Sequence, residues 1–185
     1  MGNMTGVWSN ISNIDRKSFK CGFCGVLVGS EKGYTLKQTA YIYICPNCNT
    51  PTFFVDEFQF PGSPMGNSVS HLPEDINSLY EEARKCTTQN CYTAAVLLCR
   101  KILMNVAVNL GADQNQKFID YVNFISEKGY VPPQGKHWVD HIRKKGNEAN
   151  HEIHLMDKND AKELLIFTEM LLKFNYEFPE MIPKP

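Results

Sequence analysis

Two Cys-x-x-Cys pairs, separated by twenty residues, constrain this chain more than any other feature of its sequence. The first pair is Cys21 and Cys24, and the second pair is Cys45 and Cys48. One such pair presents two thiolates on a tight turn, and two facing pairs complete the tetrahedron of sulfur ligands that zinc prefers. The sequence therefore predicts one structural zinc ion held by these four cysteines.

The residues around the two pairs predict a small β-ribbon. Gly25 and Asn49 directly follow the pairs, where the turn favours residues that tolerate a positive φ. Residues 37–44 are rich in β-branched and aromatic side chains and predict a strand, with residues 51–55 as its partner. A dithiol redox role is the alternative, but it usually needs a single pair that opens a helix.

The predicted metal site offers no open coordination position, because the protein supplies all four ligands. The zinc is therefore expected to stabilise the fold and not to catalyse a reaction. A ribbon of this kind can bind nucleic acid, bind a protein, or simply cap a fold, and these three roles stay open. Cys86, Cys91 and Cys99 lack metal-ligand spacing and are expected to act as small apolar residues.

Charge and hydropathy exclude two classes of protein. Residues 1–74 hold five basic and five acidic side chains, and residues 75–185 hold fourteen and fifteen. Neither part has the basic excess expected of a protein that coats duplex DNA. No run of about 18 apolar residues exists, so no membrane span is expected. The start of the chain lacks an apolar signal core, which predicts a cytoplasmic protein.

The predicted fold is mainly α, a bundle of about five helices preceded by the small β zinc ribbon. The expected domains are an N-terminal segment (1–18), the ribbon (19–60), a linker rich in proline and glycine (61–74) and the helical domain (75–185). Helices are predicted over residues 75–86, 90–110, 116–128, 136–151 and 159–178. Asn90 and Asn159 are the expected N-caps of the second and fifth helices, and Gly129 is the expected end of the third.

The fourth predicted helix carries a polar stripe beside its apolar face. Arg143, Asn147 and His151 recur at i, i+4 and i+8, and Arg143, Lys144 and Lys145 form a dense basic cluster beside them. These residues are candidates for catalysis (His151, Asn147 and Arg143) and for nucleic-acid binding (the basic cluster). The alternative is structural, with Asn147 and His151 joining neighbouring helices through buried hydrogen bonds.

Arg100 is a further candidate for nucleic-acid binding. It lies in the second predicted helix, which is apolar on most sides, and a lone charge in such a place needs a partner. An acidic side chain such as Glu81, Glu82 or Glu148 is the expected partner. In the other interpretation, Arg100 reaches the region of His151 and supplies a cation there.

Three segments together resemble a known family. Residues 142–152 (Ile-Arg-Lys-Lys-Gly-Asn-Glu-Ala-Asn-His-Glu), 79–83 (Leu-Tyr-Glu-Glu-Ala) and 92–103 (Tyr-Thr-Ala-Ala-Val-Leu-Leu-Cys-Arg-Lys-Ile-Leu) are similar to a domain of unknown function assigned to the HEPN superfamily. The resemblance covers roughly residues 72–178, and an N-terminal zinc ribbon is a familiar companion of this domain. It implies an all-helical homodimer that pairs through the helices beside the motif.

Many HEPN proteins are metal-independent ribonucleases, and their motif departs from this sequence at one position. The motif is an Arg, often followed by Asn, with a His four to six residues beyond the Arg. His151 and Asn147 match it, but the position of the Arg is Gly146. Arg143 lies one residue too far from His151, and the two would be about 12 Å apart along an unbroken helix.

Three functions follow from these observations. The first is a non-catalytic module that binds RNA, single-stranded DNA or a partner protein, as an accessory to a nuclease or phage-defence system. The second is a metal-independent endoribonuclease in which His151 is the general acid or base. Asn147 would orient the phosphate, and Arg143, Lys145 or Arg100 would stabilise the developing charge. The third is a dimeric scaffold without nucleic-acid contact, and a homodimer is expected in all three.

Overall fold

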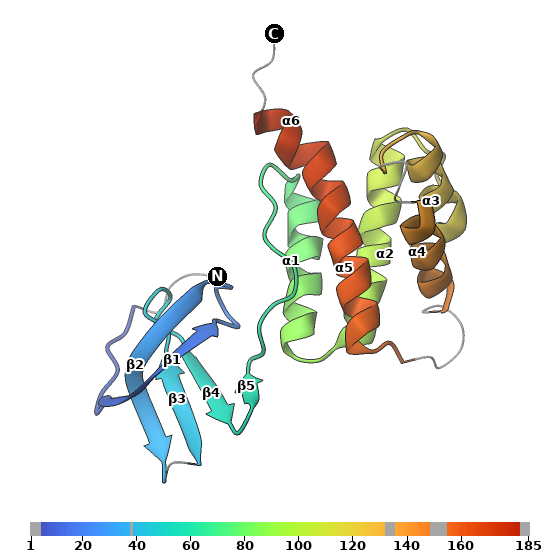
Figure 1. Ribbon diagram of the computed structural model, residues 1–185. Helices are drawn as coiled ribbons and strands as arrows, with labels where there is room; N and C mark the ends of the chain where they lie inside the picture. Colours follow the sequence, from blue (N-terminus) through green and yellow to red (C-terminus); the bar gives the residue numbers. More distant parts are fainter. Residues whose placement is uncertain (1–4, 38, 132–135, 149–154, 182–185) are drawn as a thin grey trace. The chain divides into compact units, whose positions relative to one another are not determined.

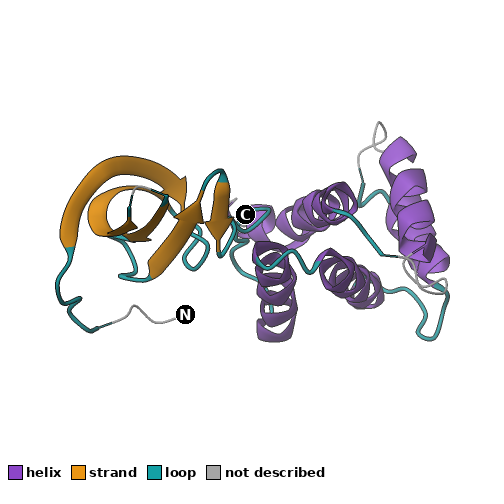
Figure 2. Cartoon of the chain, turned by 90° about the horizontal axis from the view of Figure 1, so that it is seen from below, coloured by secondary structure: helices purple, strands orange, loops and turns teal. Residues whose placement is uncertain are grey.

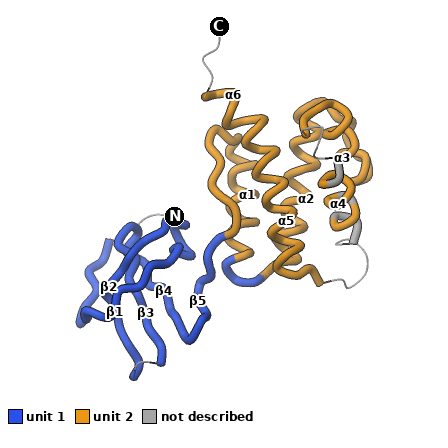
Figure 3. Tube along the Cα trace, in the orientation of Figure 1, with its two compact units in different colours: residues 1–64, 88–90 blue, residues 65–87, 91–185 orange. Residues whose placement is uncertain are grey.

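The computed structural model describes residues 5–37, 39–131, 136–148 and 155–181, without the side chains of residues 136, 137, 143 and 146–148. The chain divides into two compact units (Figure 3). The first unit comprises residues 1–64 and 88–90, and the second comprises residues 65–87 and 91–185. All the strands lie in the first unit and all the long helices in the second (Figure 2).

The first unit is a five-stranded antiparallel sheet in which each strand pairs with the next one along the chain (Figure 1). Short connections between consecutive strands make this simple order possible, because an antiparallel pair needs only a tight turn. The strands are β1 (Ser12–Lys20), β2 (Leu27–Leu36), β3 (Ala40–Ile44), β4 (Pro51–Val55) and β5 (Phe58–Phe60).

The prediction of a mainly α chain with a small β-ribbon is wrong, because a full sheet precedes the helices. The two expected strands exist and pair with each other as β3 and β4. The strands β1, β2 and β5 were not expected. Charged residues interrupt β1, and Gly29 and Gly33 interrupt β2, so neither segment has the composition typical of a strand. Backbone pairing within the sheet overrides this low propensity.

Side chains alternate along each strand, and the face with the aromatic core is the more covered one, although Ala40 and Ile44 on the opposite face are also buried. On the covered face Phe19, Tyr43 and Phe54 pack together, with ring centroids 5.2–6.1 Å apart. On the other face Phe53, the neighbour of Phe54, is 40% exposed. Gly33 is required by this arrangement, since a Cβ there would lie 1.8 Å from the carbonyl oxygen of Ile42. The covered face carries the small core of this unit.

The second unit is built from helices around a single apolar core. α2 packs against α3 and α5, and α3 packs against α4. Among the described residues, no helix is both long and apolar enough to cross a membrane. The helices are α1 (Glu74–Thr88), α2 (Tyr92–Asn109), α3 (Phe118–Glu127), α4 (Lys136–Glu148), α5 (Lys158–Leu172), the π-helical turn η2 (Lys173–Glu177) and α6 (Phe178–Met181).

Two helix ends differ from the predictions. Asn90 has a positive φ of 59° and ends α1, whereas the N-cap of α2 is Cys91. The N-cap of α5 is Asp157 instead of Asn159, and its carboxylate accepts hydrogen bonds from the backbone N–H groups of Asn159 and Asp160. Gly129, with a φ of 79°, follows the end of α3 as predicted.

The segment that precedes α1 is fixed to the helices by polar contacts. Glu169 on α5 accepts hydrogen bonds from the backbone N–H and side-chain amide of Asn67, at 2.9 and 3.1 Å. Its carboxylate also pairs with Lys173 at 2.8 Å. Farther along, Glu177 accepts a hydrogen bond from the backbone N–H of Ser70. Much of the expected linker is therefore part of the helical unit.

The contacts of Glu169 predict that its charge stabilises the second unit. Burial raises the pKa of Glu169, but the hydrogen bonds from Lys173 and Asn67 outweigh burial and leave this pKa below its usual value. A carboxyl group with a lowered pKa in the folded state stabilises the protein above its unfolded pKa, and this stability is lost as the pH falls. Glu169→Gln should therefore lower the free energy of unfolding at pH 7 by about 1–3 kcal/mol.

Urea unfolding followed by circular dichroism at pH 7 and pH 4 would measure this effect. The difference between Glu169→Gln and the wild type should shrink at the lower pH. Glu127→Gln, at an exposed position on α3, is the matched control and should change stability little. Equal stability of the Glu169 variant and the wild type at pH 7 would show that these contacts contribute nothing.

Candidate metal centre

The two cysteine pairs occupy equivalent turns in the sheet, one between β1 and β2 and the other between β3 and β4. In the first turn the backbone N–H of Gly25 donates to the carbonyl of Cys21 at 2.9 Å. In the second turn the N–H of Asn49 donates to the carbonyl of Cys45 at 2.8 Å. Gly25 and Asn49 have φ values of 71° and 59°, which confirms the expected positive φ after each pair.

Each turn is closed by a second backbone hydrogen bond of the same kind. The N–H of Cys21 donates to Val26, and the N–H of Cys45 donates to Thr50, both at 2.9 Å. A side-chain contact also holds the second turn, because the amide of Asn49 donates to the carbonyl of Gly6 at 2.7 Å. These bonds orient the sulfur atoms of both pairs toward one another.

The four sulfur atoms lie close enough to share one metal ion. All of them lie within 4.8 Å of one another. The Sγ atoms of Cys21 and Cys48 are 3.7 Å apart, and those of Cys24 and Cys45 are 3.8 Å apart. Tetrahedral zinc with Zn–S bonds of about 2.3 Å requires S–S distances of about 3.8 Å. The four cysteines therefore fit a metal ion such as zinc, as the sequence predicted.

The surroundings of the sulfur atoms suit a closed structural site. Cys21 and Cys45 are fully buried, Cys48 is nearly so, and Cys24 is half-buried. Burial raises the pKa of Cys45 to about 12. Burial also raises the pKa of Cys21. Hydrogen bonds from the N–H groups of Cys24 and Phe23 and from the hydroxyl of Thr50 outweigh burial and lower this pKa to about 7. A bound zinc ion would displace the thiol protons and leave no position for a substrate.

The candidate residues of α4 are only partly described. His151 lies outside the described residues, and the side chains of Asn147 and Arg143 also lie outside them. Lys144 is exposed, and the ammonium of Lys145 pairs with Asp160 on α5 at 2.7 Å. Their roles in catalysis or nucleic-acid binding stay predictions.

Arg100 is buried in α2, where only 7% of it is exposed. Its guanidinium lies 4.3 Å from the ring centroid of Phe118, a cation–π contact, and its Nη1 has no hydrogen-bond partner within the described part of the chain. Glu81, one of the expected partners, instead pairs with Arg84 at 2.7 Å. Burial lowers the pKa of Arg100.

Sequence reasoning did not single out a polar pair that joins α4 to α5. The Nε2 of His141 lies 2.5 Å from a carboxylate oxygen of Glu163. The one signal available in the sequence was that His141 follows Trp138 by one helical turn, which places an aromatic and an imidazole on one face of the helix. The partner on α5 could not be identified without the packing of the two helices.

Together, the fold and the cysteine site define a protein with a four-cysteine cluster that could hold a metal ion, set in an antiparallel sheet and followed by an α-helical unit. Comparison with protein-family models matches residues 81–182 to the family described as Domain of unknown function (DUF4145). This match covers more than half of the chain, and the chain belongs to that family. Searches of curated proteins and of solved structures find no match.

The cysteine geometry predicts one zinc ion per chain, on which the folding of the sheet depends. Structural zinc contributes about 10–16 kcal/mol of binding free energy to small zinc domains at pH 7. Cys45→Ser should abolish the binding of one zinc ion per chain and reduce the protection of the strands against hydrogen exchange. Elemental analysis would measure the zinc content, and amide hydrogen exchange would measure the protection.

The matched control is Cys91→Ser, because this cysteine is exposed and lies outside the cluster. It should keep one zinc ion per chain and the protection of the strands. Equal zinc content in Cys45→Ser and the wild type would contradict the assignment of the site.

Proposed function

We propose that this chain is a non-catalytic, HEPN-like zinc-ribbon module that binds single-stranded nucleic acid, RNA above all. The observation that carries the proposal is a group of exposed aromatic rings on the open face of the sheet. Phe53, Phe58 and Phe60 are 40%, 65% and 47% exposed. Proteins that bind single strands without sequence preference use aromatic side chains on which successive bases stack.

The register of the sheet brings these three rings together. Phe53 on β4 lies directly opposite Phe60 on β5, and Phe58 lies two residues before Phe60. The ring centroids of Phe53 and Phe60 are 6.4 Å apart, and those of Phe58 and Phe60 are 6.5 Å apart. The ring planes are inclined by only 33° and 28°. Neighbouring rings of similar orientation support stacking of adjacent bases more than they support a single hydrophobic anchor.

The charges of this unit favour a contact dominated by stacking. Residues 1–64 contain five basic and four acidic side chains, which is too small an excess to follow a long phosphate backbone. A single strand can still be held, since stacking on an aromatic side chain is worth about 1–3 kcal/mol per base. The proposal therefore expects binding that depends only weakly on salt, with a slope of about −1 in log K against log salt.

Two of the candidate cations, Arg100 and Lys145, support a non-catalytic role. Position 146 is a glycine, where the ribonuclease motif has an arginine. Arg100 is buried against Phe118, and Lys145 is paired with Asp160. A cation that is already committed to another side chain cannot stabilise a phosphate without losing that contact.

Binding to the aromatic rings can be measured by fluorescence anisotropy with a labelled single-stranded RNA. Phe58→Ala should weaken binding about 5-fold to 100-fold, because one stacked base would be lost. Leu36→Ala is the matched control, since Leu36 is equally exposed on the same sheet but cannot stack. Equal effects of the two substitutions would overturn the nucleic-acid proposal. It would also be overturned if the ligand that needs this face proved to be a partner protein.

The same preparations test the alternative of a metal-independent endoribonuclease. We expect the RNA to remain intact in EDTA during prolonged incubation, and His151→Ala to bind RNA like the wild type. Cleavage that is reproducible and disappears in His151→Ala would instead support the ribonuclease. A role in a nuclease or phage-defence system stays a prediction from the resemblance.

A homodimer that forms through the helical unit is also part of the proposal. Apolar side chains at the end of this unit support it, because Phe174, Phe178 and Met181 are 48%, 39% and 69% exposed. Phe174→Asp should convert a dimer into a monomer, as measured by sedimentation equilibrium. Lys162→Asp, at an exposed position on α5, is the control and should leave the dimer intact. A wild-type protein that is monomeric at high concentration would refute this part.

A further inference from the structure

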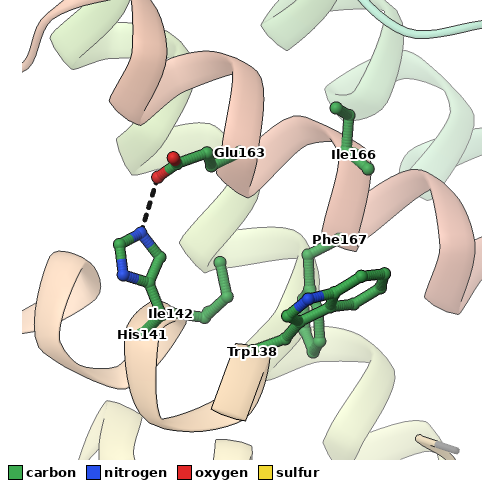
Figure 4. A pocket seen from close by; sticks show the side chains of 6 residues that line it. All are labelled: Trp138, His141, Ile142, Glu163, Ile166 and Phe167. Atoms are coloured by element: carbon green, nitrogen blue, oxygen red, sulfur yellow. Dashed lines mark hydrogen bonds and ion pairs between the residues drawn. The ribbon is translucent and has the colours of Figure 1, made fainter. Parts of the chain in front are cut away.

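A pocket of 440 Å³ lies between α4 and α5 in the helical unit (Figure 4). It differs from the cysteine site and from the aromatic face of the sheet, and neither of the functions discussed above uses it. Among the described residues, its walls include Trp138, His141 and Ile142 from α4 and Glu163, Ile166 and Phe167 from α5.

The pocket has a polar end and an apolar end. Trp138 and His141 lie one turn apart on α4, and Glu163 and Ile166 lie one turn apart on α5. His141 and Glu163 therefore face each other at one end, where their side chains are bonded. Trp138 lies beside Phe167 at the other end (Figure 4).

Stability of the fold does not account for this arrangement. The side chains of His141 and Glu163 are 44% and 49% exposed, and an exposed ion pair of this kind contributes about 0–1 kcal/mol. Trp138 also leaves 44% of its surface in contact with solvent, although Ile142 and Phe167 beneath it are fully packed. A partly open indole beside an accessible carboxylate is a combination that suits a ligand.

The chemistry of the polar end defines the ligand. Glu163 carries a carboxylate, which only accepts hydrogen bonds when ionised, and its contact with His141 uses one of its two oxygens. The second oxygen has no partner within the described part of the chain. A ligand group at this end must therefore donate a hydrogen bond, and a positive charge suits both the carboxylate and the face of a nearby indole.

We propose that this pocket binds an organic amine, with its ammonium group beside Glu163 and its apolar body against Trp138 and Phe167. The ammonium donates to the unoccupied oxygen of Glu163, and the body covers the exposed indole. Two sources supply this chemistry, namely a small arylalkylamine and the side chain of a lysine in a partner peptide. The proposal does not depend on nucleic-acid binding by the sheet.

Isothermal titration of the full chain with phenethylamine, and with phenethyl alcohol as its uncharged counterpart, would test the site. The amine should bind at least about tenfold more tightly than the alcohol, which has a neutral hydroxyl in place of the ammonium group. Glu163→Gln should remove this preference while keeping the binding of the alcohol. Trp138→Ala should weaken both ligands.

The control variant is Glu127→Gln, which lies on α3 and outside the pocket and should bind both compounds like the wild type. Equal affinity for amine and alcohol, an unchanged preference in Glu163→Gln, or no binding of the amine at about 10 mM would each overturn the proposal. A second titration with N-acetyl-lysine methylamide separates the sources. Tighter binding of this compound identifies a lysine side chain as the ligand, and tighter binding of phenethylamine identifies a small amine.

Discussion

The link between the two cysteine turns is the contact on which the first unit depends. Apart from the cysteines, the buried core cluster among its described residues comprises Phe19, Val28, Tyr43 and Phe54, with Ile14 and Tyr41 packed against it. Such a core is too small to hold a domain of this size without a further link, since small domains bury too little apolar surface to offset the entropy of folding. A metal ion bound by the four cysteines would join the β1–β2 turn to the β3–β4 turn, and so would connect four of the five strands.

This dependence explains how the sheet can leave one face open. A bound metal ion and the aromatic core would hold the covered face, so the aromatic rings on the opposite face need not be buried for stability. Phe53, Phe58 and Phe60 can remain at the surface, where their rings are accessible. An exposed group of large apolar side chains in a folded domain usually marks a place where another molecule binds. A structural metal at the cysteines and the binding role proposed for the sheet are therefore compatible.

The metal site could be predicted from the sequence, whereas the extent of the sheet could not. The spacing of the cysteines, the glycine after the first pair and the asparagine after the second pair all indicate local turn geometry. Such geometry depends on residues that are close together in the sequence. The strand β1 is formed by residues 12–20, whose charged side chains give no strand signal, and its pairing with β2 comes from the hairpin that the first cysteine turn closes. Asn90 shows a similar ambiguity, since asparagine favours both helix starts and left-handed helix ends. The pairing of His141 with Glu163 depended on helix packing, which spacing alone does not reveal.

The helical unit shows why exposed residues are more informative than buried ones in this protein. Its core is complete, with Ile76, Ile102, Leu103, Leu164 and Leu171 fully buried, and these residues explain only why the unit folds. Single apolar side chains at a surface are ordinary and need no explanation. Trp138 is different because it lies over a pocket that also contains a carboxylate, so apolar surface and charge occur together. The exposure of Trp138 is not required for stability, and Glu163 beside it can bind a cation. A ligand that covers both side chains explains this arrangement best.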